Sequence, residues 1–214
     1  IYSDGRLVIS DWDGKVYLLS ADDGKELWTH ETQSEINGSP TIHEDQVLVA
    51  SSDAKLYCFR LQTGEPVWQG GDDLASYSSP RTIQIGSKTV VLYFARDHLL
   101  AVDPTDGKML WKHPHRADIL ESVNAMMPII DDGRIFISEC YQVGSVLLKA
   151  SLDDPTTIWQ DPPKDRRSQA MRCHWSTPIL VDGFLYGCSG RNNPDSDFRC
   201  VELATGKVQW SDDR

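Results

Sequence analysis

The sequence predicts an all-β chain in which a unit of four short antiparallel strands recurs about five times. A short phrase ending in tryptophan returns along the chain, as in ADDGKELW at 21–28 and LQTGEPVW at 61–68, and successive phrase-ending tryptophans lie 40, 43, 48 and 51 residues apart. The segments between them alternate apolar and polar residues and show no 3.6-residue apolar period. Units of this length with four strands each are typical of β-propeller blades.

Each expected blade begins near a proline and ends near a tryptophan. In the second unit the expected strands are PTIHE, QVLVAS, KLYCFR and PVWQ, which are rich in β-branched and aromatic residues. The first unit offers only GRLVIS, KVYLLS and ELWTH, so we expect its innermost strand to be missing, apart from what Ile1 and Tyr2 could form. The chain is then a single partial propeller domain at 1–214, with blades at about 1–32 (incomplete), 36–70, 76–113, 124–160 and 174–214.

The repeated phrase predicts a turn and a joint between blades. Four of the five units carry a glycine four residues before the tryptophan, where a hairpin turn needs positive φ, and the fourth unit has Pro155 instead. One large ring at the same place in every repeat is expected to pack against the next blade rather than to stack on a ligand. The residues of this motif are Gly24, Trp28, Gly64, Trp68, Gly107, Trp111, Trp159, Gly206 and Trp210.

Composition argues against a nucleic-acid-binding protein and against a membrane-spanning helix. The net charge of −11 over 214 residues argues against nucleic acid as a partner, because phosphate contacts need clustered cations. No apolar run approaches the ~18 residues that a membrane-spanning helix needs, and the opening IYSDGRLVIS does not read as a signal segment. Among five cysteines, Cys188 and Cys200 flank one long hairpin loop, where either a disulfide or, for Cys200, simple core packing can be expected.

The loops sort onto two faces of the expected blades. Turns between the first and second strands are short, whereas the connections between blades, counted from tryptophan to proline, grow from 12 to 12, 17 and 19 residues. Irregular loops on one side of a regular scaffold are where binding residues concentrate. The candidate binding face comprises Arg167, Arg172, His174, Trp175, Arg191 and Asn192, and the alternative is that these are solvated residues of variable loops. A hard-cation site formed by Asn192, Asn193, Asp195 and Asp197 is a weaker alternative, because no spaced glutamate or glycine pivot accompanies it.

The block AVDPTDGKMLW at 101–111 resembles the tryptophan-docking motif of the PQQ-like, quinoprotein-type β-propeller family. Ala101, Asp103, Gly107 and Trp111 occupy motif positions, and Asp106 stands where the family has threonine. The resemblance covers the whole chain. Because rings of this family usually close with seven or eight blades, it implies that these residues are part of a larger propeller. The family contains both quinone-dependent dehydrogenases and scaffolds without a quinone, so the fold leaves the function open.

The resemblance favours a non-catalytic scaffold for protein interactions, similar to the outer-membrane assembly lipoproteins of the bacterial envelope. It implies a protein partner, a periplasmic or cell-envelope location and no cofactor, catalytic residue or resident metal. Under the first alternative, the chain belongs to an alcohol or sugar dehydrogenase that binds PQQ and calcium. However, the adjacent cysteine pair and the haem-attachment motif of those enzymes are absent from the sequence. Under the second alternative, the propeller is the sensor of a larger multidomain protein such as a kinase.

Overall fold

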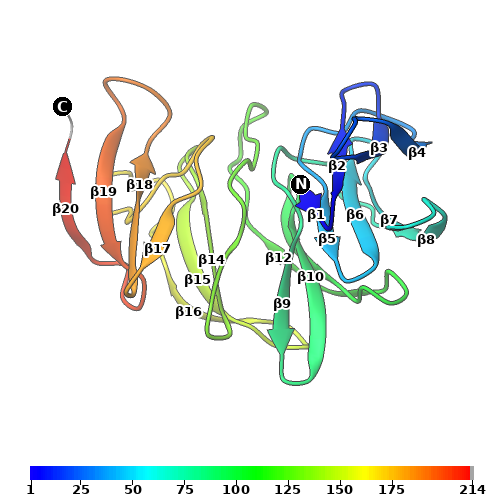
Figure 1. The fold of residues 1–214 in the computed structure, drawn as a ribbon. Coiled ribbons are helices and arrows are strands. Elements are labelled where there is room, and N and C mark those ends of the chain that lie inside the picture. Colours follow the sequence, from blue (N-terminus) through cyan, green and yellow to red (C-terminus); the bar gives the residue numbers. More distant parts are fainter. Residues whose placement is uncertain (213–214) are drawn as a thin grey trace.

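The computed structural model describes residues 1–212 and confirms the predicted fold class. Within this range the chain forms twenty strands in five four-stranded antiparallel sheets and has no helix. The sheets follow one another around an arc, with the first sheet on the right and the last on the left of Figure 1. The last two residues of the expected blade at 174–214 lie outside the described residues.

Every sheet keeps the order of its strands along the chain, from an inner to an outer strand. The first two sheets are β1 (Tyr2–Ser3), β2 (Arg6–Ser10), β3 (Lys15–Ser20) and β4 (Glu26–Glu31), then β5 (Thr41–His43), β6 (Gln46–Ser51), β7 (Lys55–Arg60) and β8 (Pro66–Gly70). The third and fourth are β9 (Arg81–Ile85), β10 (Lys88–Phe94), β11 (His98–Val102) and β12 (Met109–Pro114), then β13 (Ile129–Asp131), β14 (Arg134–Glu139), β15 (Gly144–Lys149) and β16 (Thr156–Gln160). The fifth is β17 (Ile179–Val181), β18 (Phe184–Ser189), β19 (Asp197–Glu202) and β20 (Val208–Asp212).

The first blade has a fourth, inner strand of two residues, at Tyr2–Ser3 and not at Ile1 and Tyr2, the two residues left for it in the sequence. The two residues of β1 pair with β2, with Tyr2 opposite Leu7 and Ser3 opposite Arg6. The connecting residues Asp4 and Gly5 both have positive φ, of 49° and 76°. Such a two-residue turn suits the twist of a β-hairpin and is favoured by the Asp-Gly dipeptide. This local turn is enough to hold a strand that is too short to show alternation in the sequence.

The tryptophans join each blade to the next. Four of them donate a hydrogen bond from Nε1 to a backbone carbonyl of the following blade: Trp28 to Leu61 at 2.9 Å, Trp68 to Pro104 at 2.7 Å, Trp111 to Ser151 at 2.9 Å and Trp159 to Leu203 at 2.8 Å. The fourth blade accepts this bond although Pro155 replaces its turn glycine. Trp210 packs instead against Tyr186 and Phe198 of its own blade and remains 46% exposed.

A turn glycine forms the floor on which the preceding tryptophan lies. A Cβ atom built on Gly107 would come 2.5 Å from the Trp68 ring, and φ at Gly107 is 75°. Gly24 has nearly the same φ of 71°, but a Cβ atom there meets nothing within 4 Å. Backbone strain from a substitution is therefore common to the turns at Gly24 and Gly107, whereas close packing is present only at Gly107. Comparing substitutions at the two glycines separates the two effects.

We expect Gly107→Ala to lower the free energy of unfolding by about 1–3 kcal/mol more than Gly24→Ala does, since overpacking a tight contact has this cost. Urea titrations of the two variants and the wild type measure the difference. Equal losses in the two variants would show that the Trp68 ring is not held against the turn.

The central sheets carry most of the core. Strands β10, β11, β14 and β15 are almost continuously buried, because they are flanked by blades on both sides. The largest cluster of buried side chains spans the third, fourth and fifth blades. A rigid interior of this kind holds the loops at both ends of the strands in fixed positions.

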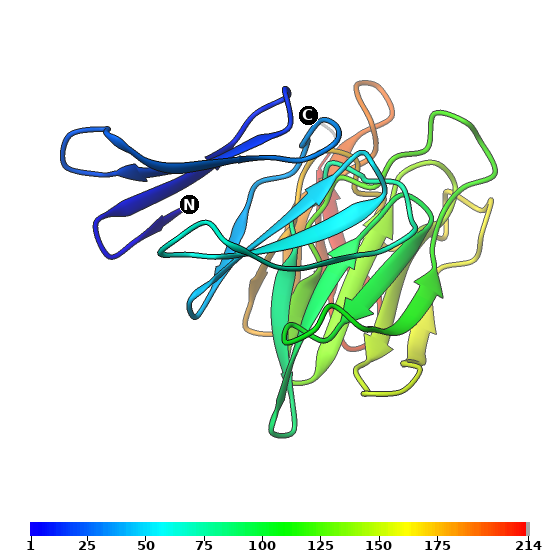
Figure 2. The same ribbon diagram turned by 90° about the vertical axis from the view of Figure 1, so that its right-hand side faces the viewer.

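Two faces result, as Figures 1 and 2 show. The β2–β3 and β18–β19 loops lie at the top of Figure 1, and the β9–β10 turn lies at the bottom. We call the face that carries the second-to-third strand loops and the inter-blade connections the loop face. The opposite face, with the first-to-second and third-to-fourth strand turns, is called the turn face.

Candidate functional site

The loop face exposes large apolar side chains from four separate connections. Trp12 lies in the β2–β3 hairpin and is 75% exposed, and Leu120 lies between β12 and β13 and is 79% exposed. The further members are Leu74 and Tyr77, between β8 and β9, Ile119 beside Leu120, and Trp175, between β16 and β17. Apolar side chains gathered from several loops on one face are typical of a protein-binding surface.

An aromatic cluster lies at the centre of the loop face. The ring of Trp175 meets the ring of Tyr77 edge-on, with centroids 5.0 Å apart, and the ring of His174 at 4.6 Å. His174 in turn meets Tyr141 edge-on at 5.3 Å, and the guanidinium of Arg191 lies over the Tyr141 ring at 5.4 Å. We call these five residues the aromatic rim. Two inter-blade connections and two hairpin loops supply them, so the blades must pack before the rim exists.

Three of the six residues predicted for the binding face belong to the rim, namely His174, Trp175 and Arg191. Trp175 is 60% exposed and Arg191 is exposed, so both can meet a partner. Arg167 and Asn192 are also exposed, but neither contributes a side chain to the rim. The backbone carbonyl of Asn192 accepts a hydrogen bond from the amide of Asp195 at 2.8 Å, within the loop.

The expectation that Arg172 lies on the binding face is corrected, because its charge is not available at the surface. Its side chain is buried, and it donates from Nη1 to the Asp195 carboxylate at 3.2 Å and from Nη2 to the Asp195 carbonyl at 3.3 Å. Its own carbonyl accepts from the Gly190 amide at 2.6 Å. Arg172 therefore fastens the long β18–β19 loop to the connection before β17. A buried arginine needs such pairing, which sequence order alone does not reveal.

The expectation for His174 is corrected as well, because its side chain is buried and does not present a positive charge at the surface. Its Nε2 lies 3.2 Å from the hydroxyl oxygen of Tyr141. Burial lowers the pKa of His174, and the nearby positive charge of Arg191 lowers it further. The imidazole is therefore neutral near pH 7 and serves to hold the neighbouring rings of Tyr141 and Trp175 in place.

The β18–β19 loop uses its carboxylates for internal ion pairs. Asp195 pairs with both Arg166 and Arg172, and Asp197 holds Arg199 through both carboxylate oxygens, at 2.6 and 2.9 Å. Within residues 1–212, no group of three or more potential ligands among His, Cys, Asp and Glu could hold a metal ion. These pairings leave no carboxylate of the loop free for the cation considered from the sequence.

The predicted Cys188–Cys200 disulfide is absent, since both thiols are free in the structure. The strand register explains why: Cys188 lies opposite Phe198, and Cys200 lies opposite Tyr186. The two cysteines are thus displaced by two residues along the paired strands, and directly opposed positions would be needed for an unstrained bond. Cys200 is buried, as the core-packing alternative expected.

A buried carboxylate supports the rim from below. Glu139, at the end of β14, accepts a hydrogen bond from the Ser122 hydroxyl at 3.0 Å and one from the Tyr141 amide at 2.9 Å. Glu139 therefore ties the connection that carries Leu120 to the segment that carries Tyr141. Burial raises the pKa of Glu139 to about 7, and the two hydrogen bonds oppose this rise only in part.

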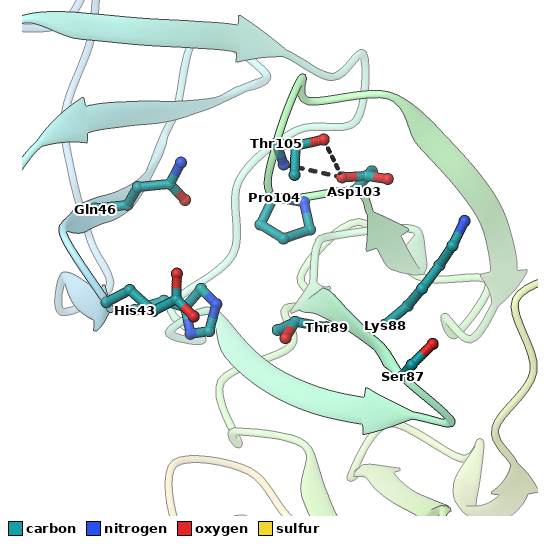
Figure 3. Close-up of a pocket in the computed structure, with 9 residues that line it drawn as sticks. His43, Gln46, Ser87, Lys88, Thr89, Asp103, Pro104 and Thr105 are labelled. Carbon is teal, nitrogen blue, oxygen red and sulfur yellow. Dashed lines mark hydrogen bonds between the residues drawn. The ribbon is translucent and has the colours of Figure 1, made fainter.

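A polar cleft of about 330 Å³ lies on the turn face, between the second and third blades (Figure 3). His43 and Gln46 approach it from one blade, and Lys88 and the turn at 103–105 from the other. Asp103 accepts hydrogen bonds from the amide and the hydroxyl of Thr105, at 2.9 and 2.6 Å, and these bonds lower the pKa of Asp103. The Asp103 carboxylate is therefore engaged in its own turn.

Sequence reasoning missed Tyr77 and Tyr141 as partners in the rim. A signal for Tyr77 exists: it stands three residues before Pro80, as Trp175 stands three residues before Pro178. The same repeat position is held by Asn37 and Ala125 in the other two units with such a proline. Tyr77 and Trp175 are exposed at this position, whereas Asn37 and Ala125 are half-buried. Tyr141 carries no comparable sequence pattern.

The fold and this face define a β-propeller of tryptophan-docked blades with an apolar loop face. The family described as "Outer membrane protein assembly factor BamB" matches residues 1–212, and the chain belongs to that family. It is 27% identical to the outer membrane protein assembly factor BamB of Nitrosomonas eutropha, over 100% of this chain and 50% of the relative. The chain spans about half the length of the curated BamB relatives that it matches.

Solved structures and other relatives agree on the fold. The crystal structure of BamB from Moraxella catarrhalis matches 97% of this chain and 61% of its own, with a TM-score of 0.76 and 16% identity. A quinoprotein ethanol dehydrogenase of Pseudomonas putida is 25% identical over 73% of this chain and 27% of its own length. Residues 1–212 contain no helix with the length and apolar character needed to cross a bilayer.

Proposed function

We propose that this chain is a non-catalytic propeller scaffold that binds a protein partner of outer-membrane assembly in the bacterial envelope, through its loop face. Membership of the family described as outer membrane protein assembly factor BamB supports the setting. Support for a binding role comes from the exposure of Trp12, Leu120 and Trp175 on one face of a rigid arc.

The contrast between the two faces carries the proposal. Large exposed apolar side chains come from four connections of the loop face, whereas the turn-face cleft is lined by charged and hydroxyl side chains such as Lys88, Asp103 and Thr105. A scaffold needs a preformed surface with a low entropic cost of binding, and loops anchored on packed strands supply it. Interfaces of this kind are built around aromatic and aliphatic side chains at their centre.

A photo-crosslinking experiment tests this function. A photoreactive phenylalanine analogue replaces Leu120 or Trp12 on the loop face, and matched variants carry it at Lys88 or Thr105 on the turn face. After irradiation of cells that produce the protein, adducts are identified by mass spectrometry. We expect one defined adduct, with a component of outer-membrane assembly, from the loop-face positions only. Adducts of equal yield from both faces, or from the turn face alone, would contradict the proposal.

A further inference from the structure

A groove of about 690 Å³ runs along the inner strands, below the rim. Tyr77 and Trp175 of the aromatic rim line one part of it, and Arg81, at the start of β9, lines another. The remaining wall consists of the prolines that open the inner strands, together with serine, threonine, alanine, methionine and isoleucine side chains: Ile1, Ser39, Pro40, Thr41, Ile42, Ser79, Pro80, Thr82, Ala125, Met127 and Thr177.

The charge of the groove is opposite to that of the chain. The protein has 32 acidic residues and a net charge of −11, yet no carboxylate is among the described residues that line the groove. Arg81 is exposed, and its guanidinium takes part in none of the hydrogen bonds or ion pairs found within residues 1–212. A cation without a partner in a groove free of carboxylates favours an anionic group on the ligand.

The groove is also preformed. Hydrogen bonds between neighbouring blades fix its wall: the Ser39 amide donates to Ser79 Oγ at 2.9 Å, and the Met127 amide donates to Thr177 Oγ1 at 2.9 Å. The two aromatic side chains are fixed as well, because Trp175 packs between Tyr77 and the buried His174. Binding therefore orders few side chains, which lowers its entropic cost.

The backbone of the wall can pair with an extended segment. The inner strands β5 and β9, which line the groove, are at the edges of their sheets and pair on one side only. Their other edges carry amide and carbonyl groups without a sheet partner, as edge strands do. An extended peptide can form backbone hydrogen bonds with such an edge while its side chains fill neighbouring pockets.

We propose that this groove binds an extended peptide segment that carries an aromatic side chain next to a carboxylate. The aromatic side chain packs against Tyr77 and Trp175, and the carboxylate pairs with Arg81. The proposal rests on the proposed scaffold function and names the chemistry of the bound segment. An acidic side chain and a peptide's C-terminal carboxylate supply the same chemistry, and the test separates them.

Fluorescence anisotropy with labelled eight-residue peptides tests the proposal on the purified chain. One peptide has a central Phe-Asp pair and capped ends, and its variants have Ala-Asp or Phe-Asn instead. A further peptide lacks the aspartate and ends in Phe with a free carboxylate. We expect saturable binding of the capped Phe-Asp peptide, weakened at least about tenfold by either change, which corresponds to 1.4 kcal/mol or more. Tighter binding of the peptide with the free terminus would assign the carboxylate to a C-terminus.

Matched variants locate the site. Trp175→Ala and Arg81→Gln are expected to weaken binding at least about fivefold, whereas Trp12→Ala and Arg167→Gln, which lie outside the groove, change it less than twofold. Trp175→Phe and Arg81→Lys should restore part of the affinity, which shows that the variants are folded. The proposal is overturned if the wild type shows no saturable binding, or if the Ala-Asp and Phe-Asn peptides bind as well as Phe-Asp.

This outcome is separable from that of the scaffold proposal. Leu120 and Trp12 do not line the groove, so crosslinks formed there do not depend on peptide binding. Crosslinks from Leu120 without peptide binding would leave the scaffold in place and remove the groove as a peptide site. Peptide binding without crosslinks would leave the groove as a peptide site and remove the scaffold proposal.

Discussion

Trp111→Ala is expected to lower the free energy of unfolding by ~3–5 kcal/mol, the range found for large aromatic side chains removed from a core. Trp111 is 3% exposed, lies in the largest core cluster and donates from Nε1 to the Ser151 carbonyl of the fourth blade at 2.9 Å. Its removal leaves a cavity between two blades and takes a hydrogen bond from the half-buried Ser151 carbonyl, and both effects act in the same direction.

Equilibrium denaturation in urea measures this loss, with Trp12→Ala as the control. Trp12 is 75% exposed in the β2–β3 hairpin, so its replacement should change the free energy of unfolding by no more than about 0.5 kcal/mol. A loss below about 1 kcal/mol for Trp111→Ala would show that the ring does not join the third and fourth blades.

Glu139→Gln is expected to gain stability relative to the wild type as the pH rises. Burial raises the pKa of Glu139 from 4.5 to about 7, so between these values the folded chain holds a proton that the unfolded chain has released. The contribution of Glu139 to the stability of the wild type therefore falls as pH increases through this window, and the glutamine variant lacks this contribution. At 1.4 kcal/mol for each pKa unit, the difference between variant and wild type should change by about 3 kcal/mol between pH 4 and pH 8.

Unfolding free energies of Glu139→Gln and the wild type, measured at several pH values, test this prediction. The quantity of interest is how the difference between the two proteins changes with pH. Its absolute value also contains the cost of placing a glutamine amide near the Tyr141 amide. Ser138→Ala provides the control, because Ser138 is a buried, non-titrating neighbour on β14 that donates to the Met171 carbonyl at 2.9 Å. Its cost should not vary with pH. A Glu139→Gln difference that is constant from pH 4 to pH 8 would show that Glu139 titrates normally in the folded protein.

The fold was predictable because each blade repeats the same local pattern. Alternation defines the strands, and a glycine four residues before a tryptophan marks the turn on which the preceding blade's tryptophan lies, as at Gly107 and Trp68. The short strand β1 could be anticipated only as what Ile1 and Tyr2 could form, since two residues show no periodicity. The Asp4–Gly5 turn places it at Tyr2–Ser3.

The candidate site was predictable only in part. The choice of the loop face as the candidate binding face rests on loop lengths, which are a property of the sequence. Which side chains reach the surface depends on contacts between distant segments, such as Arg172 with Asp195 and His174 with Tyr141. Arg172 and His174 were expected on the candidate binding face and are buried by these contacts. They also bring Tyr77, nearly a hundred residues away in sequence, against Trp175.

The measurement that tests the central claim most directly is the yield of photo-crosslinks from Leu120 compared with that from Thr105. The two positions lie on opposite faces of the same arc and are both exposed. A protein scaffold that works through its loop face predicts a defined adduct, with an outer-membrane assembly component, from Leu120 and none from Thr105. An adduct from Thr105 with none from Leu120 would contradict it and would assign partner binding to the turn face.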